Sequence, residues 1–469
     1  MKRRAFLTGS GTLFLATLTG CGGSGNNDTT SPQSPASYAP LKIPPLREGA
    51  DFDLSLQEGA VEFLEGLFTP TWGIDGDFLG PALRVRTGDA IRLAVTNNLP
   101  EATTLHWHGM RLPGPMDGGP HQIIQPGETW LAEYKILQGA GTNWFHPHRE
   151  GVTGEHVYRG LAGLLIVEDG SSESLDLPRT WGEDDIPLIL QDRRFNADGT
   201  FDYLSQPMEE INGMLGDTYL VNGTLGAGIR LPAKEVRFRI LNGSNAREYD
   251  LRFSDGRTFR QIATDNALLE QAATLTRLRL TPGERAEIVV DLGADLGNTL
   301  TLVNADDGNA PLLVLDVADT PSSVTTTPDT LTTLEHLDPL QALTTRTFRL
   351  GMQMGLFTIN GVAMDMERID QVVPLGAVEI WEIINETNML HNFHVHGTHF
   401  EILDRNGSPA QVEAYEAGYK DTVRVGPLER VRIILRMEDY TTDENAPYMF
   451  HCHILEHEDR GMMGQFIVV

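Results

Sequence analysis

The stretch AVEIWEIINETNMLHNFHVHG, residues 377–397, joins two strand-like runs through an Asn-containing turn. Apolar and polar residues alternate in it, as they do in strands with one buried face. Two earlier stretches have the same order of features, AIRLAVTNNLPEATTLHWHG at 90–109 and EVRFRILNGSNAREYDLRFS at 235–254. A pattern that repeats on the scale of a domain predicts three related β-modules.

The rest of the chain also consists of short strand-like runs. β-Branched and aromatic residues recur between clusters of Gly, Pro, Asn and Asp, as in LAGLLIVEDG at 161–170 and RVRIILRMED at 430–439. These runs predict an all-β protein built of sandwich or barrel modules. Polar, turn-rich segments near 170 and within 318–345 separate the modules, so the predicted domains are 45–170, 171–325 and 326–469.

Composition limits the class of partner. The chain has 469 residues, enough for several domains, and a formal net charge of −29. Nucleic acids and anionic membrane surfaces bind positively charged proteins, so neither is expected as a partner. A small neutral, cationic or metal-ion substrate suits this charge. No stretch after residue 20 is long and apolar enough to cross a bilayer.

Residues 1–20 have the features of an export signal. Basic residues precede a short apolar run, and small residues precede Cys21. RRAFL resembles a twin-arginine signal, and LTGC resembles a bacterial lipobox, whose cysteine carries lipid; a plain secretory signal is the alternative. Residues 21–44 are predicted to be a flexible tether. We therefore expect export to the bacterial periplasm or cell envelope, with membrane contact only through a lipid anchor at Cys21.

Histidine pairs of the form H-x-H occur four times among the 14 histidines. Random placement at this frequency would give roughly 0.4 such pairs, so the excess indicates a function. Residues i and i+2 of a strand point to the same face, so each pair can offer two imidazoles to one site. One pair alone is more often a pair of exposed histidines, but four pairs in two equivalent module positions predict metal binding. The pairs are His106/His108, His146/His148, His394/His396 and His451/His453.

The tripeptide HCH at 451–453 is predicted to contact two different metal sites. On one strand its two histidines face one way, and Cys452 faces the other. By the same parity, His391 points away from the H-x-H pair that follows it. Cys452, His391 and His457 then form one set, with Met462 in a nearby Gly-containing loop. Two imidazoles, a thiolate and a distant thioether are blue-copper ligands, whereas zinc, the rival metal, commonly takes more cysteines and no methionine.

The motifs HWHG, HPH, HNFHVHG and HCHILEHEDRGMM resemble those of the three-domain multicopper oxidases in order and position, and the similarity covers residues 45–469. This resemblance implies an all-β fold of three cupredoxin-like Greek-key β-barrel domains, with no copper ligand in the second. It also implies four copper ions per chain, one type 1, one type 2 and two type 3. The implied ligands are His391, Cys452, His457 and Met462 for type 1, His106 and His394 for type 2, and His108, His146, His148, His396, His451 and His453 for type 3.

Within that family the chain looks most like bacterial laccase-like enzymes, including periplasmic cuprous oxidases and, less closely, bilirubin oxidases. The complete ligand set argues against the copper-free members that serve as division or scaffold proteins. The long Met/His-rich insert of the cuprous oxidases is missing, and Asn392 stands where many relatives have proline. An extra cuprous ion bound by Met352, Met354 and Met389 is one possibility, but core packing is the default expectation for Met352 and Met354.

The resemblance implies one-electron oxidation of phenols, aromatic amines or pigments, coupled through Cys452 to reduction of dioxygen to water. Oxidation of cuprous, manganous or ferrous ions is the alternative, and a copper carrier without oxygen chemistry is a third reading. Asp117 and Glu458 match proton-relaying residues of such enzymes; the competing interpretations are a turn aspartate and a solvated acid. No motif around His391 identifies the physiological donor, and no feature predicts the oligomeric state.

Overall fold

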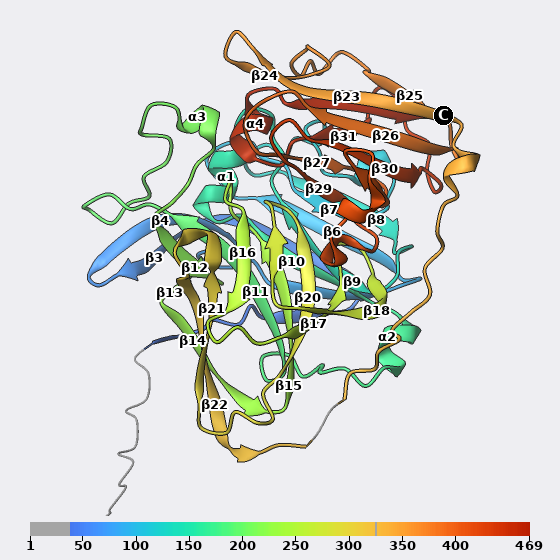
Figure 1. The fold of residues 1–469 in the computed structure, drawn as a ribbon. Helices are drawn as coiled ribbons and strands as arrows, with labels where there is room; N and C mark the ends of the chain where they lie inside the picture. The colour runs from blue at the N-terminus through green and yellow to red at the C-terminus, as the bar shows by residue number, and fades with distance from the viewer. Residues whose placement is uncertain (1–37, 324–325) are drawn as a thin grey trace, which may run out of the picture. The chain divides into compact units, whose positions relative to one another are not determined.

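The structure is a computed structural model that describes residues 38–323 and 326–469. The predicted export signal, Cys21 and most of the predicted tether lie outside these residues. In the described part of the chain, strands dominate and helices are short (Figure 1), which confirms the predicted all-β class. No helix among these residues is long and apolar enough to cross a membrane.

The three repeated stretches form equivalent strands in three pairs of sheets. β6 (Ala90–Asn97), β15 (Glu235–Asn242) and β26 (Val378–Asn385) each lie between a parallel and an antiparallel neighbour. After the Asn-containing turn the chain crosses to the opposing sheet as β7 (His106–His108), β16 (Tyr249–Phe253) and β27 (His391–Val395). The repetition in the sequence therefore corresponds to three copies of one two-sheet module.

The first pair of sheets packs around residues such as Leu93 and Trp107, which are fully buried because alternate strand residues face inward. One sheet contains, in order, β4 (Leu67–Ile74), β3 (Asp51–Leu64), β6 and β8 (Thr129–Lys135). The other contains β2 (Leu46–Glu48), β5 (Ala82–Arg86), β10 (Gly163–Glu168), β9 (Gly141–His146) and β7.

The second pair of sheets encloses a core that includes Ile240 and Leu251. One sheet contains, in order, β1 (Ala39–Pro40), β14 (Ala227–Ala233), β22 (Ala310–Pro321), β21 (Thr299–Asn304), β16 and β19 (Leu278–Leu280). The other contains β13 (Thr224–Leu225), β12 (Thr218–Val221), β11 (Asp185–Arg193), β15, β20 (Arg285–Asp291), β17 (Phe259–Ala263) and β18 (Leu268–Leu275). Because β1 pairs with β14, residues 39–40 of the predicted tether are part of this module.

The third pair of sheets packs around Trp381 and Phe450. One sheet contains, in order, β24 (Leu356–Ile359), β23 (Thr344–Gln353), β26, β30 (Arg430–Arg436) and β28 (Phe400–Arg405). The other contains β25 (Gln371–Val373), β32 (Met463–Val468), β31 (Tyr448–His451), β27 and β29 (Thr422–Val425). Met352 and Met354, at the tip of the β23–β24 hairpin, are 45% and 104% exposed. The default expectation of core packing is therefore wrong for both, because the hairpin tip extends beyond the sheet that would cover it.

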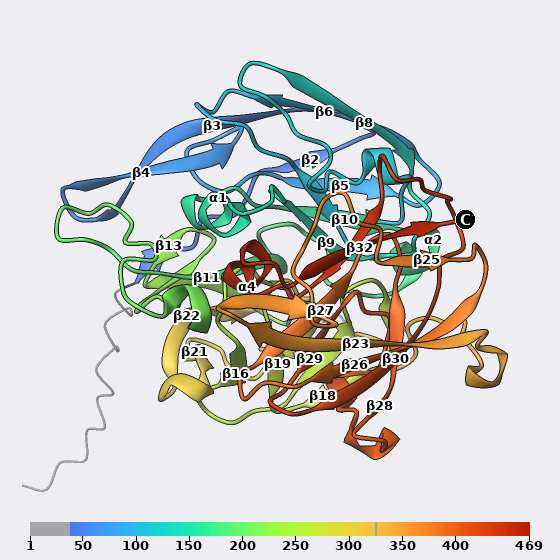
Figure 2. The ribbon, with the colours of Figure 1, turned by 90° about the horizontal axis from the view of Figure 1, so that it is seen from above.

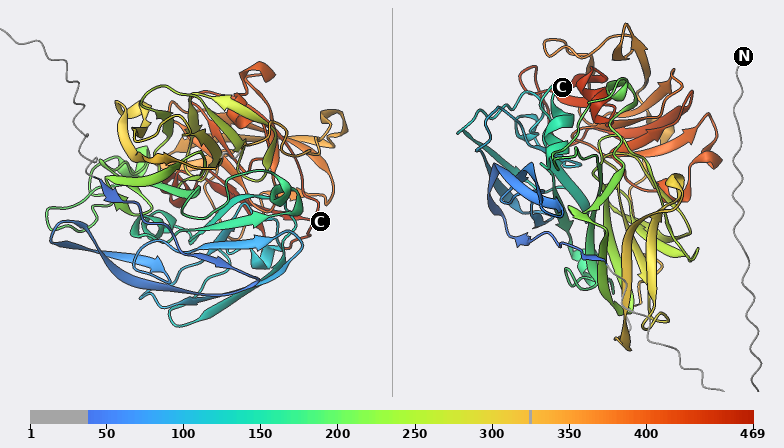
Figure 3. Two further views of the ribbon diagram at one scale, coloured as in Figure 1. Left: turned by 90° about the horizontal axis from the view of Figure 1, so that it is seen from below. Right: turned by 90° about the vertical axis from the view of Figure 1, so that its left-hand side faces the viewer.

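Two short helices follow histidine-bearing strands. α1 (Thr153–Arg159) and α4 (Leu455–Asp459) follow the second and fourth histidine pairs and pack against each other, and α3 (Glu209–Asn212) packs on α4. In Figures 2 and 3 the first and third pairs of sheets, blue to cyan and orange to red, lie side by side, and the green-to-yellow second pair adjoins both. The remaining helical segments are α2 (Gly170–Ser174) and 3₁₀ turns at Gly114–Met116, Ala305–Asp307, Pro339–Gln341, Pro409–Gln411 and Ala414–Glu416.

Candidate metal centre

The four histidine pairs meet between the first and third pairs of sheets. β7 and β9 are antiparallel neighbours that place His106 opposite His146, and β27 and β31 place His394 opposite His451. Between the two modules, the ring of His106 stacks on that of His396 with 3.9 Å between centroids. All eight paired histidines are buried. The structure therefore brings together all the imidazoles that the sequence predicted to share one centre.

The outer ring nitrogen of each paired histidine except His453 lies against a backbone carbonyl or a carboxylate. In six of the seven this contact is a hydrogen bond, which places the proton on the outer nitrogen and leaves a lone pair on the inner one; His148 Nδ1 lies near a carboxylate oxygen without such a bond. The contacts are His106 Nδ1 to Asp117 O (2.9 Å), His108 Nε2 to Asp421 Oδ1 (2.9 Å), His146 Nδ1 to Pro147 O (2.8 Å), His148 Nδ1 to Glu458 Oε1 (3.3 Å), His394 Nδ1 to Asp421 O (2.8 Å), His396 Nδ1 to Asp117 Oδ2 (2.7 Å) and His451 Nδ1 to Cys452 O (3.1 Å).

The inner nitrogens point at one another. Nε2 of His451 lies 3.1 Å from Nε2 of His148 and 3.2 Å from Nε2 of His396. With the outer nitrogens of His396 and His451 protonated, no proton is left to form a hydrogen bond between these two rings. Two donors bound at about 2 Å to one tetrahedral ion lie about 3.3 Å apart, so this spacing fits a metal ion.

Ring nitrogens of the other paired histidines also lie close together or without a partner. Nε2 of His146 lies 3.3 Å from Nδ1 of His108 and 3.4 Å from Nε2 of His453. Nε2 of His106 and of His394 is buried and has no hydrogen-bond partner among the described residues. Buried polar atoms without partners are costly, so these lone pairs also fit a bound cation.

Burial favours the neutral form of several of these imidazoles. Desolvation lowers the pKa of His148 and His396 well below the usual range and lowers that of His394 to about 4. At neutral pH these three imidazoles are therefore neutral, which is the state that binds metal.

Cys452 lies in a second, separate set. Its Sγ is 3.6 Å from Nδ1 of His391 and 3.7 Å from Nδ1 of His457, and these two nitrogens are 3.0 Å apart. Burial raises the pKa of the Cys452 thiol to about 12, so binding of a cation there would release a proton. Met462 is fully buried in the same core cluster, and its carbonyl accepts a hydrogen bond from the backbone N–H of Cys452 at 3.0 Å. Sulfur and imidazole donors in this arrangement fit copper.

The predicted separation of Cys452 from its neighbours holds, but the predicted continuous strand does not. β31 ends at His451, so Cys452 and His453 lie beyond it. Likewise β9 ends at His146 and β27 at Val395, inside their motifs. After β9 and β31 the chain turns into α1 and α4, and after β27 it turns into β28.

Asp117 and Glu458 both lie beside the histidine cluster. Asp117 ends a 3₁₀ turn, as the competing interpretation expected, yet it is only 1% exposed and contacts His106 and His396. Glu458 is only 2% exposed, so it is not a solvated acid. Its burial opposes ionisation, but His148 and His451, at 3.3 and 3.1 Å, outweigh that effect and lower its pKa to about 2.

Asp421 is a residue of the centre that sequence reasoning missed. Its Oδ1 accepts a hydrogen bond from His108 Nε2, and its backbone oxygen accepts one from His394 Nδ1. Arg285, from the second module, donates to both carboxylate oxygens. Burial opposes the charge of Asp421, but Arg285 and His108 lower its pKa well below the usual range. Asp421 directly precedes β29 (Thr422–Val425) and belongs to no sequence motif. Only the pairing of β29 with β27 shows that it is part of the centre.

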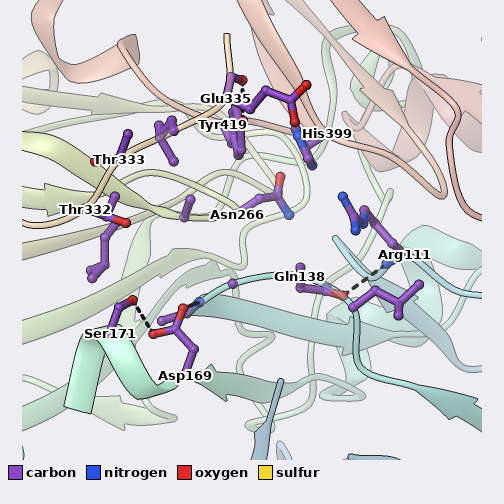
Figure 4. Close-up of a pocket in the computed structure, with 16 residues that line it drawn as sticks. Arg111, Gln138, Asp169, Ser171, Asn266, Thr332, Thr333, Glu335, His399 and Tyr419 are labelled. Carbon is purple, nitrogen blue, oxygen red and sulfur yellow. Dashed lines mark hydrogen bonds between the residues drawn. The ribbon is translucent and has the colours of Figure 1, made fainter. Parts of the chain in front are cut away.

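The four histidines outside the motifs are not part of the cluster or of the Cys452 set. His121 bonds to Gln465, His156 to Thr103, and His336 to Glu270 and Glu401. His399 stacks on Tyr419 beside a cavity of about 250 Å³ (Figure 4).

The cavity of Figure 4 lies close to the histidine cluster and is lined by residues of all three modules. Gln138 and Asn266 on its wall both donate to the carbonyl of Gly109, the residue after His108. No residue of the Cys452 set lines it, so it is not an approach to the thiol.

Comparison with known proteins gives one family. Two models described as multicopper oxidase match residues 55–172 and 327–469. A multicopper oxidase of Staphylococcus haemolyticus is 36% identical over 422 residues, which are 89% of this chain and 88% of that protein. The cell division protein FtsP of Pectobacterium atrosepticum is 34% identical over 490 residues, 100% of this chain and 99% of that one.

Solved structures agree with this result. The bacterial laccase-like multicopper oxidase CueO from the lignin-degrading Ochrobactrum sp. is similar at a TM-score of 0.86 and 38% identity, covering 92% of this chain and all (100%) of that one. A multicopper oxidase from Campylobacter jejuni, described as a metallo-oxidase, has a TM-score of 0.79 and 28% identity, covering 94% and 98%.

Proposed function

The chain belongs to the multicopper oxidase family, and from this premise we propose that it oxidises small organic donors of the phenol, aromatic amine or pigment class. Membership implies copper binding and oxidoreductase chemistry with dioxygen as acceptor; the laccase-like donor and complete reduction to water are the proposal. The observation that carries it is Cys452, whose thiol belongs to one ligand set while the histidines on either side belong to the other.

Four copper ions per chain are proposed. One would take His391, Cys452, His457 and Met462, and three would share the eight paired histidines, with the type 2 ion on His106 and His394. When bound, copper supplies the one-electron and dioxygen chemistry that side chains lack. The intact donor sets support an enzyme, in contrast to a carrier, which would need only the Cys452 set.

Asp117 and Glu458 are proposed to relay the protons that dioxygen reduction consumes; Glu458, whose pKa is lowered to about 2, would carry each proton only transiently. Both carboxylates are buried beside imidazole nitrogens of the cluster, so they are within reach of it and shielded from bulk water. Neither contacts the Cys452 set through its side chain.

We predict that Asp117→Asn and Glu458→Gln each slow dioxygen consumption by about a hundredfold, at the lower end of general acid–base contributions because the other carboxylate remains. The blue absorption of the type 1 copper should stay intact in both variants. Stopped-flow reoxidation of the reduced enzyme and the visible spectrum measure the two properties. Loss of the blue colour would show that the replaced carboxylate is structural.

A metal-ion oxidase is the second candidate function. Met352 and Met354 are exposed on the β23–β24 hairpin, and Phe357 of the same hairpin stacks on His457 with 4.0 Å between centroids. Thioethers are ligands that favour Cu(I), so these side chains support cuprous ion as a donor near this ligand.

An oxygen electrode separates the candidates. The copper-loaded enzyme is given 2,6-dimethoxyphenol, an aromatic amine, or cuprous, manganous or ferrous ions, with and without added copper. Uptake with phenols but not with metal ions supports the organic donor, and the reverse supports the metal oxidase. No uptake with any donor would leave only a copper-binding role.

Export to the periplasm or cell envelope and a lipid anchor at Cys21 remain proposals that rest on residues 1–21. Labelling of the expressed chain with a fatty acid, compared with a Cys21→Ala variant, tests the anchor.

A further inference from the structure

The two imidazoles of the Cys452 set have outer N–H groups, and both point away from the thiol. Nδ1 of each ring faces Cys452, so the proton lies on Nε2. Nε2 of His391 lies 3.0 Å from the hydroxyl oxygen of Thr387, and Nε2 of His457 lies 2.9 Å from the carbonyl oxygen of Ile211. Each outer N–H therefore already has an acceptor within the protein.

The hydroxyl of Thr387 has no hydrogen-bonding capacity left. It donates to Oδ1 of Asn385 at 2.8 Å and accepts from the backbone N–H of Met389 at 3.2 Å as well as from His391. A hydroxyl has one proton to donate and two lone pairs. Thr387 is thus fully engaged by the protein and cannot pass a hydrogen bond on to a bound donor.

The loop that carries Thr387 is held in place by Asn385. The side-chain amide of Asn385 donates to the carbonyl oxygens of Met389, Val425 and Gly426, at 2.8, 3.2 and 2.8 Å. Asn385 is only 1% exposed, while Thr387 is partly exposed. The buried amide therefore fixes Thr387 as a partly exposed cover over His391, which is itself fully buried.

The cover over His457 comes from the second module. Ile211 lies in α3, and the loop after α3 is tied to α4 because Met214 N–H donates to Glu456 Oε2 at 3.0 Å. Arg460, just after α4, pairs with Glu210 of α3. The carbonyl of Ile211 is therefore held against His457 at both ends of its helix.

We propose that Thr387 and Ile211 take both outer N–H groups, so that electron donors reach the type 1 copper without a hydrogen bond to either imidazole ligand. The choice of donor then depends on the reduction potential of the donor and on its shape complementarity to the protein surface. Thr387 is the residue that prevents the His391 N–H from donating a hydrogen bond to a phenol oxygen. With copper bound, a phenol would lose one electron to the cupric ion and its proton to solvent, because the Thr387 hydroxyl has no free acceptor site for that proton. This inference rests on the proposed function, since it concerns the donor side of the same site.

Three substitutions at Thr387 in the copper-loaded enzyme separate access from hydrogen bonding. Thr387→Ala removes both the cover and the acceptor, Thr387→Val keeps a cover of the same shape without the acceptor, and Thr387→Ser keeps the hydroxyl. The donors are 2,6-dimethoxyphenol, which can accept a hydrogen bond from His391, and ferrocyanide, as an outer-sphere control.

We expect Thr387→Ala to lower KM for the phenol by about two- to tenfold, the value of one net hydrogen bond, with KM for ferrocyanide unchanged. Thr387→Val should leave both KM values unchanged, and Thr387→Ser should behave like the parent protein. Redox titration of the type 1 copper gives a readout independent of turnover. Its potential should become more positive in the Ala and Val variants, because the His391 N–H loses its acceptor and the imidazole donates less charge.

The inference is overturned if Thr387→Ala leaves the phenol KM unchanged, if Thr387→Val lowers it equally, or if neither variant shifts the potential. Absence of oxygen uptake with both donors would instead reject the proposed function, and the redox titration would still test the hydrogen bond from His391 to Thr387.

Discussion

Replacement of Cys452 by serine is expected to stop oxidation of every donor and to lower the copper content from the proposed four ions per chain to three. The thiol sulfur lies 3.6 Å from Nδ1 of His391 and 3.7 Å from Nδ1 of His457. When several residues act together in catalysis, removing one of them abolishes nearly all of their joint rate enhancement. We therefore expect the rate of oxygen consumption to fall by about a thousandfold or more. Copper analysis, the visible spectrum and an oxygen electrode measure the three consequences.

Met462→Leu is the matched control for the Cys452 variant. Met462 is fully buried in the same core cluster, and leucine fills nearly the same volume without a thioether. This variant should keep four copper ions and the blue colour while the type 1 potential shifts, because the axial ligand tunes that potential. If the serine variant kept its colour, or if both variants lost one copper ion, the assignment of the thiol would be wrong.

Replacement of Asp421 by asparagine is expected to destabilise the copper-free protein by about 3–5 kcal/mol, because the change leaves Arg285 as a buried charge without its bidentate partner. Asp421 and Arg285 both have fully buried side chains. The same change weakens the contact that orients His108, so copper binding at the histidine cluster should also fall. Urea unfolding of the copper-free protein and copper titration measure the two effects.

Asp51→Asn provides the control for this charge removal. Asp51 pairs with Arg92 at 2.6 Å, but both side chains are exposed, so solvent screens the pair and no measurable loss of stability is expected. Equal stability losses in the two variants, or none in Asp421→Asn, would contradict the role assigned to the buried pair.

The parts of the centre that could be predicted from the sequence are those with a local pattern. The spacing of His451, Cys452 and His453 sorts their side chains because neighbouring residues of an extended chain point in opposite directions. That argument survives even though β31 ends at His451. The repeat at 90–109, 235–254 and 377–397 identified equivalent strands because one strand-turn-strand unit leaves the same alternation wherever it occurs.

The parts that could not be predicted depend on contacts between distant residues. Asp421 and Arg285 are 136 positions apart and belong to different modules, and neither has a neighbour of diagnostic type. Thr387 is only four positions from His391, yet a threonine in a turn has many ordinary roles. The exposure of Met352 and Met354 depends on how far the hairpin extends past its sheet. That length cannot be predicted from the residue type at these positions.

The stacking of His106 on His396 joins residues 290 positions apart, and the groups His106/His394/His396 and His148/His396/His451 each draw on both of the modules that meet there. An ion held by either group would lose a ligand if the modules separated, so complete loading of the cluster is expected only after the two have docked. A spectrum that shows the cluster copper as well as the blue type 1 copper would then indicate that the modules are fully assembled. A chain truncated or misassembled at that junction would lack the absorption of the cluster copper while its strands remained folded.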